Sequence, residues 1–503
     1  MKSRPLATAL VVIALLSAAA CGGSSDGAGS AGQPMPESGK PVPQPTLAET
    51  GDRDTAEVEA PEAVATRQRD TATEQISTFA LDVDTASYGY SRRLLQDGGL
   101  PEPGQVRPEE FVNSFAQDYR EPDDDGFTVH MDGARTPKNG TALLRVGLQT
   151  RRAAAEARRP ANLTFVVDVS GSMSEPGRLD LVREALHKLV DQLGPGDQVA
   201  VVAFSDRADT VLSMTPATDR DRLHAAVERL AIGQSTNLEA GLTSGYAEAA
   251  ESFRAVAVNR VILLSDGLAN VGDTTWQGIL DRVEDAAGKK ITLLCVGVGR
   301  DYGDRLMEQL ADNGDGAAVY VSSVDDARKV FVEQLATNLD LRARDAKAQV
   351  VFNPSVVESY RLIGYENRQL ATEDFRDDAK DGGEVGPGHS VTALYEVRLR
   401  GGASGQLATA TVRWQDPDTR DPAEASRSLA AGDLAASLWR ESASRFQVDV
   451  VAAGFAEYLR TGEGIAGAAP KDLAAHATRL AASTEDPAVT ELATLIERAM
   501  SLR

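Results

Sequence analysis

The sequence has few of the residues from which many metal and redox sites are built. Cysteine occurs only at Cys21 and Cys295, and histidine occurs five times in 503 residues. Cys295 lies in an apolar, strand-like run, which favours a buried thiol, since reactive cysteines lie in exposed electropositive settings. The histidines show no metal-ligand spacing, and His187 is interpreted as a packed or surface side chain. A site built from cysteine or histidine is therefore not predicted.

Basic residues and familiar catalytic motifs are also scarce. The chain has 52 Lys and Arg against 75 Asp and Glu, a formal net charge of -23, which becomes -25 if Lys2 and Arg4 are removed with a signal segment. This charge disfavours nucleic acid, whose binding depends on Lys and Arg that neutralise phosphates. It equally disfavours direct contact with an anionic membrane surface. There is no Walker loop, no His-Glu-x-x-His and no Gly-x-Ser-x-Gly motif.

The first twenty residues are predicted to be a secretory signal. Lys2 and Arg4 precede an apolar stretch from 6 to 20 that is too short for an ordinary membrane span. Ser17–Cys21 resembles a bacterial lipobox, which implies that Cys21 becomes the lipid-modified first residue. The sequence departs from the lipobox at Ala18, where leucine is usual. The alternative is cleavage after Ala-x-Ala, which would leave a secreted protein with a free Cys21.

Residues 21–74 are predicted to be a lipidated, disordered tether. They are rich in Gly, Ser, Pro, Ala, Glu and Thr, and no aromatic residue occurs before Phe79. Such a composition buries too little apolar surface to offset the entropy of ordering. A flexible coil of this length spans about 40 Å.

Residues 156–342 are predicted to form an α/β domain with a doubly wound, mostly parallel sheet. Strand-like runs alternate with amphipathic helical segments, and this alternation implies right-handed crossovers. Asp209–Met214 is expected to be a short antiparallel edge. The strands are expected at 162–168, 198–204, 259–265, 291–297 and 317–321.

The flanks of this domain, 75–155 and 343–503, are predicted to be an N-terminal flanking domain and a C-terminal domain that is first β-rich and then helical. The helical part is expected to begin after Ala423. Strands of 125–150 and 344–415 are expected to pair, so that one β-rich body surrounds the inserted α/β domain. The acidic run Glu373–Glu384 is expected to be a solvated loop.

Three loops that follow predicted strands or lie between helices carry oxygen side chains. Asp168–Ser172 (Asp-Val-Ser-Gly-Ser) follows the apolar run 163–167, Ser235–Asn237 lies between two helical patterns, and Asp266 ends the run 260–265. Ligands of open α/β sheets bind outside the carboxyl ends of the strands. Oxygen ligands without His or Cys suit a hard ion such as Mg²⁺. The candidate metal ligands are Asp168, Ser170, Ser172, Thr236 and Asp266.

Each of these pieces also has a simpler interpretation. The serines could cap a helix that starts near Arg178, since Ser and Asp are favoured at such caps. Asp266-Gly267 could be a plain turn.

Taken together, these residues resemble the metal-ion-dependent adhesion site of von Willebrand factor type A domains. That resemblance implies Mg²⁺, or else Mn²⁺ or Ca²⁺, coordinated by Ser170, Ser172 and Thr236, with the two aspartates binding directly or through water. It also implies a protein partner that presents an Asp or Glu as the final ligand. Because only Asp168 and Asp266 are anionic, the ion stays electrophilic and attracts an outside anion.

Motifs in the flanks resemble those of the bacterial YfbK-like lipoproteins. They are Leu81–Tyr88, Arg92–Leu95, Val106–Phe115, Val350–Pro354, Leu362–Arg368 and His389–Glu396. The expected protein is an exported lipoprotein at the outer face of the cytoplasmic membrane or in the periplasm, and it contacts the membrane through its lipid anchor only.

The expected output is binding and not turnover. Two alternatives stay open: a metal-dependent hydrolase that polarises a phosphoryl or carbonyl group, and a scaffold whose metal only stabilises its loops. Against the hydrolase, no His, Lys or Glu is visibly placed as a general base. The sequence does not identify the partner, the physiological ion, the pathway or the oligomeric state.

Overall fold

The computed structural model describes residues 67–503 apart from 82, 153–158, 267–275, 299–303, 315, 322, 329, 332–340, 379 and 381. The predicted signal segment, Cys21 and residues 22–66 of the predicted tether lie outside the described residues. The predicted end of the tether at residue 74 is wrong, because Arg69–Asp70 form a strand that pairs with the strand Val357–Ile363. Within the part that the structure describes, no helix is both long and apolar enough to span a bilayer.

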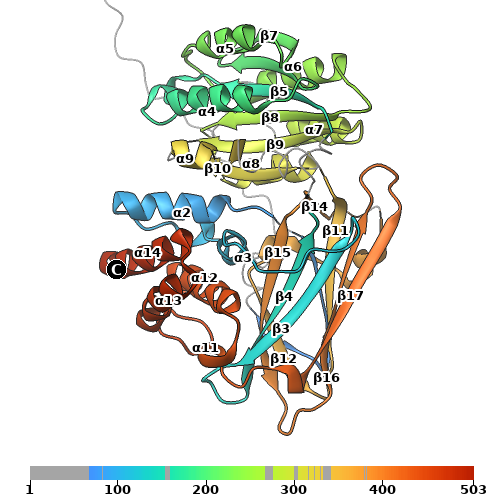
Figure 1. The fold of residues 1–503 in the computed structure, drawn as a ribbon, viewed down its shortest axis with the longest axis vertical. Coiled ribbons are helices and arrows are strands. Elements are labelled where there is room, and N and C mark those ends of the chain that lie inside the picture. The colour runs from blue at the N-terminus through green and yellow to red at the C-terminus, as the bar shows by residue number, and fades with distance from the viewer. Residues whose placement is uncertain are drawn as a thin grey trace, which may run out of the picture. The chain divides into compact units, whose positions relative to one another are not determined.

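The α/β part contains one six-stranded sheet in the order β10-β9-β8-β5-β6-β7 (Figure 1). Its strands pair in parallel, except β7, which is antiparallel to β6 at one edge. The predicted fold class is therefore confirmed. The strands are β5 (Ala161–Asp168), β6 (Gln198–Phe204), β7 (Ala208–Pro216), β8 (Val258–Ser265), β9 (Ile291–Val298) and β10 (Ala317–Val321).

Helices bury both faces of this sheet, as its nearly continuous apolar strands require. Alternate residues of β5 enter opposite cores: Phe165 packs with the residues of α4 and α5, whereas Val166 packs with those of α6, α7 and α8. The helices are α4 (Leu179–Gln192), α5 (Arg220–Glu228), α6 (Leu238–Glu251), α7 (Trp276–Ala287), α8 (Asp304–Asn313) and α9 (Val324–Arg328).

The flanks share two further sheets, in the orders β1-β12-β15-β4-β3 and β13-β2-β11-β16-β17. The expected pairing of the flanks is present, because β4 pairs with β15 and β2 with β11. Residues of both sheets form one apolar core between them, so the sheets make a sandwich. The strands are β1 (Arg69–Asp70), β2 (Ile76–Ala80), β3 (Phe127–Arg135), β4 (Thr141–Thr150), β11 (Ala343–Phe352), β12 (Val357–Ile363), β13 (Gln369–Leu370), β14 (Gly383–Val385), β15 (Ser390–Leu399), β16 (Gln406–Gln415) and β17 (Pro422–Ala430).

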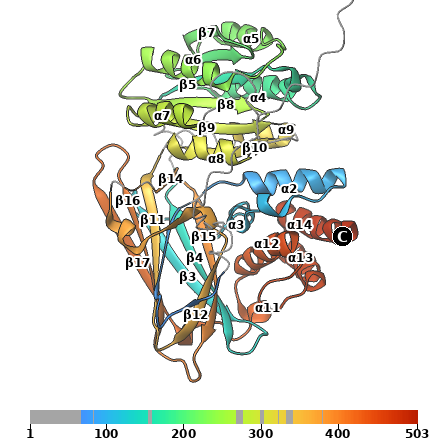
Figure 2. The same ribbon diagram turned by 180° about the vertical axis from the view of Figure 1, so that it is seen from behind.

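A helical layer packs on the outer face of the five-stranded sheet (Figure 2). Leu143 of β4 and Leu394 of β15 belong to this layer, while their neighbours Leu144 and Tyr395 point into the sandwich. At the centre is α12, whose residues from Phe446 to Leu459 are all buried. The helices are α2 (Ala86–Asp97), α3 (Pro108–Asn113), α11 (Leu438–Glu441), α12 (Ser444–Thr461), α13 (Pro470–Thr484) and α14 (Pro487–Leu502).

The predicted start of the helical part at Ala423 is wrong. Residues Pro422–Ala430 form the strand β17, which pairs with β16 at the edge of its sheet. Its alanines, glutamate and arginine favour a helix in isolation. Pairing with a neighbouring strand overrides that local preference, as is common for strands.

Candidate metal site

Asp168 ends β5 at the centre of the α/β sheet and has no exposed surface. Its Oδ1 accepts a hydrogen bond from Ser170 N at 2.8 Å, and its Oδ2 accepts one from Ser265 Oγ at 2.6 Å. Burial raises the pKa of this carboxyl above its usual range, although the bonds from Ser265 and Ser170 act in the opposite direction. These hydrogen-bond donors are neutral. In the described part of the chain, no cationic side chain contacts the Asp168 carboxylate.

The two predicted serines lie in the turn that follows. Gly171–Ser174 form a short 3₁₀ helix, and Ser170 Oγ lies 3.0 Å from Ser172 Oγ. Helix α4 begins at Leu179, and neither serine makes a side-chain cap to it. The capping interpretation of the serines is therefore wrong. The Ser170 hydroxyl interacts with the buried Asp168 carboxylate, and the Ser172 hydroxyl contacts that of Ser170.

Thr236 lies in the loop before α6 and is buried. Two main-chain hydrogen bonds hold this loop against the serine turn, from Gly233 N to Val169 O at 2.6 Å and from Gly171 N to Gln234 O at 3.3 Å. The loop also packs closely on its other side, where a Cβ added at Gly233 would lie 2.4 Å from Ser205 Oγ. The next residue, Asn237, caps α6 by accepting from Ala240 N.

Asp266 follows β8 and is paired with a buried guanidinium that the sequence did not single out. Arg178 Nη1 donates to Asp266 Oδ2 and, at 3.2 Å, to the carbonyl oxygen of Ser172. Its Nη2 forms an ion pair with Glu175 at 2.9 Å. Arg178 therefore connects the aspartate loop to the serine turn. Residue Gly267, the second half of the suggested turn, lies outside the described residues.

The donor set fits a hard divalent cation. Two carboxylates and three hydroxyls, all oxygen donors, suit Mg²⁺. Within the described residues, no three His, Cys, Asp or Glu side chains are grouped so that they could hold an ion. The predicted set has only two such residues and depends on hydroxyls for the rest.

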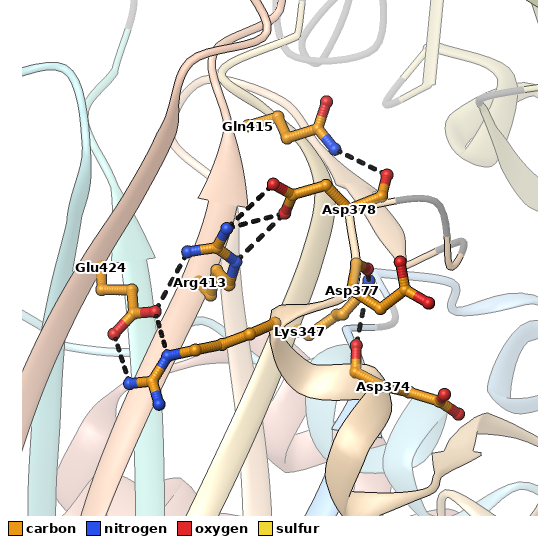
Figure 3. Close-up of polar contacts among 8 residues, drawn as sticks. Lys347, Asp374, Asp377, Asp378, Arg413, Gln415 and Glu424 are labelled. Carbon is orange, nitrogen blue, oxygen red and sulfur yellow. Dashed lines mark hydrogen bonds and ion pairs between the residues drawn. The ribbon is translucent and has the colours of Figure 1, made fainter.

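A second polar cluster lies in the sandwich, where the sequence suggested a solvated acidic loop (Figure 3). Arg413 of β16 makes a bidentate pair with Asp378 and also pairs with Glu424. Lys347 of β11 is buried and donates to the carbonyl oxygens of Asp374 and Asp377, at 3.4 and 2.6 Å. The described part of the acidic run is therefore fixed to the sheet.

Two polar contacts of the α/β part were not predicted from the sequence. Arg178 looked like an ordinary residue before a helix, although its place just after Asp-x-Ser-x-Ser was a usable signal. His187 of α4 and His224 of α5 lie together, with their Nδ1 atoms 2.7 Å apart. No local spacing indicated this contact, because it joins two separate helices.

The chain matches three protein-family models. The model "von Willebrand factor type A domain" matches residues 163–268, "von Willebrand factor" matches 58–145, and "Uncharacterized protein YfbK, C-terminal" matches 337–406.

Two relatives and one solved structure show the extent of the similarity. The chain is 36% identical over 336 residues to uncharacterized protein YfbK of Escherichia coli (strain K12), which is 65% of this chain and 58% of the relative. It is 30% identical over 292 residues to uncharacterized protein sll0103 of Synechocystis, which is 52% of this chain and 67% of the relative. The solved structure of von Willebrand factor type A from Catenulispora acidiphila aligns with 74% of this chain and 89% of its own, with 16% identity and a TM-score of 0.44.

Proposed function

Since the chain belongs to the von Willebrand factor type A domain family, and residues 337–406 match the C-terminal region of YfbK, we propose that it binds a protein partner through a divalent metal ion. The observation that carries the proposal is the Asp168 carboxylate, which is fully buried with only neutral hydrogen-bond donors around it. A buried charge is costly unless it is paired. A bound cation would supply the missing charge.

The residues that would hold the ion are Asp168, Ser170, Ser172, Thr236 and Asp266. When bound, Mg²⁺ would offer an open coordination position to a carboxylate oxygen of the partner. Asp168 would supply the buried negative charge, and the hydroxyls would add neutral donors without further charge. Arg178 would keep Asp266 oriented from the outer side.

The charges at the site favour an anionic partner. The buried groups Asp168, Asp266 and Arg178 leave one net negative charge, which a divalent ion would convert into one net positive charge; Glu175, the other partner of Arg178, is 62% exposed, so solvent screens its charge. The partner is therefore proposed to present an Asp or Glu side chain. Binding, and not turnover, is the proposed output.

Partner capture with and without Mg²⁺ tests the proposal. Ser172→Ala and Thr236→Ala should each weaken capture as strongly as chelation does, and their effects should not add to chelation, since each removes the same ion. Ser174→Ala is the matched control, because Ser174 lies in the same turn but donates to the Gly171 carbonyl oxygen. A purely stabilising metal would lower the melting temperature on chelation and leave capture unchanged, and an enzyme would lose turnover. Capture that is indifferent to the ion contradicts the proposal.

We also propose that Cys21 is acylated and anchors the protein at the outer face of the cytoplasmic membrane or in the periplasm. Support comes from the charged start, the apolar stretch and the small residues before Cys21. Cys21→Ala should move the protein from the membrane fraction to the soluble fraction. If the variant partitions into detergent like the wild type, the anchor is not Cys21.

A further inference from the structure

Helices α4 and α5 meet along a seam of polar side chains on one face of the α/β sheet. His187 and Asp191 are one turn apart on α4, and His224 and Glu228 are one turn apart on α5, so each pair lies on one helix face. The imidazole rings are stacked, with centroids 5.0 Å apart and planes 29° apart. Their Nδ1 atoms face each other at 2.7 Å.

Both outer ring nitrogens contact carboxylates. His187 Nε2 lies 2.9 Å from Glu228 Oε1, and His224 Nε2 lies 3.3 Å from Asp191 Oδ1. An ionised carboxylate only accepts hydrogen bonds, so the tautomer with its proton on Nε2 lets each ring face its carboxylate as a donor. In that tautomer the two Nδ1 lone pairs face each other across 2.7 Å.

We propose that the two Nδ1 atoms form a binding site for an imidazole-preferring transition-metal ion, Zn²⁺, Cu²⁺ or Ni²⁺. Imidazole suits these ions, whereas the oxygen site at Asp168 suits Mg²⁺. A metal-binding histidine usually donates its other ring N–H to a carboxylate, and the seam already has that arrangement on both sides. The ion accepts both Nδ1 lone pairs, and each Nε2–H stays on its carboxylate.

Metal binding requires only a small movement of the two imidazole rings. Two nitrogens bound tetrahedrally to one ion at 2.0–2.1 Å lie about 3.3 Å apart, so the Nδ1 atoms must separate by about 0.6 Å. The side chains are 28% and 32% exposed and can turn without disturbing the core residues of either helix. The described residues offer no group of three metal-binding side chains, so water would fill the remaining positions.

Copper binding to the full chain tests the site, with Cys21→Ala as background so that residue 21 carries neither a thiol nor a lipid, and with saturating Mg²⁺ to fill the oxygen site. Electron paramagnetic resonance should show one Cu²⁺ coupled to two imidazole nitrogens. Because the nitrogen count is read with both histidines intact, this result does not depend on whether the variants fold.

His187→Gln and His224→Gln should each reduce the coupling to one nitrogen and weaken binding at least about tenfold. The matched control is His476→Gln, since His476 is a half-buried helical histidine that stacks on Trp439 with no second imidazole beside it. A double variant that binds Cu²⁺ with unchanged affinity and spectrum would overturn the proposal. So would a wild-type spectrum without imidazole coupling that is lost in Asp168→Asn, because the ion would then occupy the oxygen site.

Discussion

The β-sandwich and the edge of the α/β sheet differ in how their buried charges are paired. In the sandwich, Arg145 of β4 pairs with Asp132 at 2.7 Å and with Asp449 of α12 at 2.9 Å. The cluster around Arg413 and Lys347 is likewise saturated by carboxylates and carbonyl oxygens (Figure 3). These networks are closed without any outside group.

At the sheet edge, Asp168 is as deeply buried as Asp449 but has no cationic side chain beside it in the described residues. The difference indicates two roles. A closed ion network fixes one element on another, and losing one partner is costly because the other charge stays buried. An uncompensated carboxylate in a cleft or at a sheet edge is a candidate functional group.

The largest predicted effect is on the closed network. Arg145→Met should lower the free energy of unfolding by about 3–5 kcal/mol, because Asp449 is left buried without its partner. Urea unfolding measures this loss, and Mg²⁺ affinity should not change. Adding Asp449→Asn should restore most of the stability.

The pH dependence of the stability loss gives a second test of Arg145→Met. Burial raises the pKa of Asp449 to about 6, although Arg145 and Gln117 act to lower it. Without Arg145 the acid form is favoured further, so the loss of stability should shrink as the pH falls. A loss that is independent of pH would mean that packing, and not charge, is the cause.

A smaller effect is predicted for Arg178, which forms a buried ion pair like those of the sandwich but lies at the candidate metal site. Arg178→Gln should destabilise the metal-free protein by about 3 kcal/mol, since it leaves Asp266 without its cation. Added Mg²⁺ should then raise the melting temperature more than it does in the wild type, because the ion would compensate two carboxylates. Arg183→Gln is the control on the same helix, where the arginine binds the Leu230 carbonyl oxygen. Equal Mg²⁺ stabilisation in both proteins would contradict this account.

The next largest effect is predicted for Asp168→Asn, which tests the candidate metal site directly. The variant should lose at least about a hundredfold in Mg²⁺ affinity, or about 2.7 kcal/mol. Its metal-free stability at neutral pH should not fall, because the substitution removes a buried charge that has only neutral donors. Calorimetry and thermal melts measure the two quantities. A large loss of metal-free stability would show that the carboxylate is structural.

The sequence predicted those parts of the molecule that depend on local pattern. Apolar runs located the strands of the α/β sheet to within a residue or two, and the polar residues after them located the candidate site. The strand β17 was missed, since its alanine-rich sequence favours a helix and only pairing with β16 makes it a strand. Arg178 was missed although its position after Asp-x-Ser-x-Ser was a signal, because only the tertiary fold brings Asp266 to it. The contact of His187 with His224 could not be predicted, because it joins two helices that only the tertiary fold brings together.

The smallest predicted effect is the contribution of Asp168 to the pH dependence of folding stability. Burial raises the pKa of Asp168, so in the metal-free protein the folded state binds this proton more tightly than the unfolded state. Asp168 therefore makes the stability fall as the pH rises from the usual carboxyl range through the raised pKa. Asp449 contributes a slope of the same sign, so the informative quantity is the difference between wild type and Asp168→Asn, in which only Asp168 is removed. Saturating Mg²⁺ should remove the pH dependence of this stability difference, because the ion and the proton compete for one carboxylate. For the same reason, the apparent Mg²⁺ affinity of the wild type should weaken on acidification. Parallel stability curves for the two proteins, with and without Mg²⁺, would mean that Asp168 does not titrate against the ion.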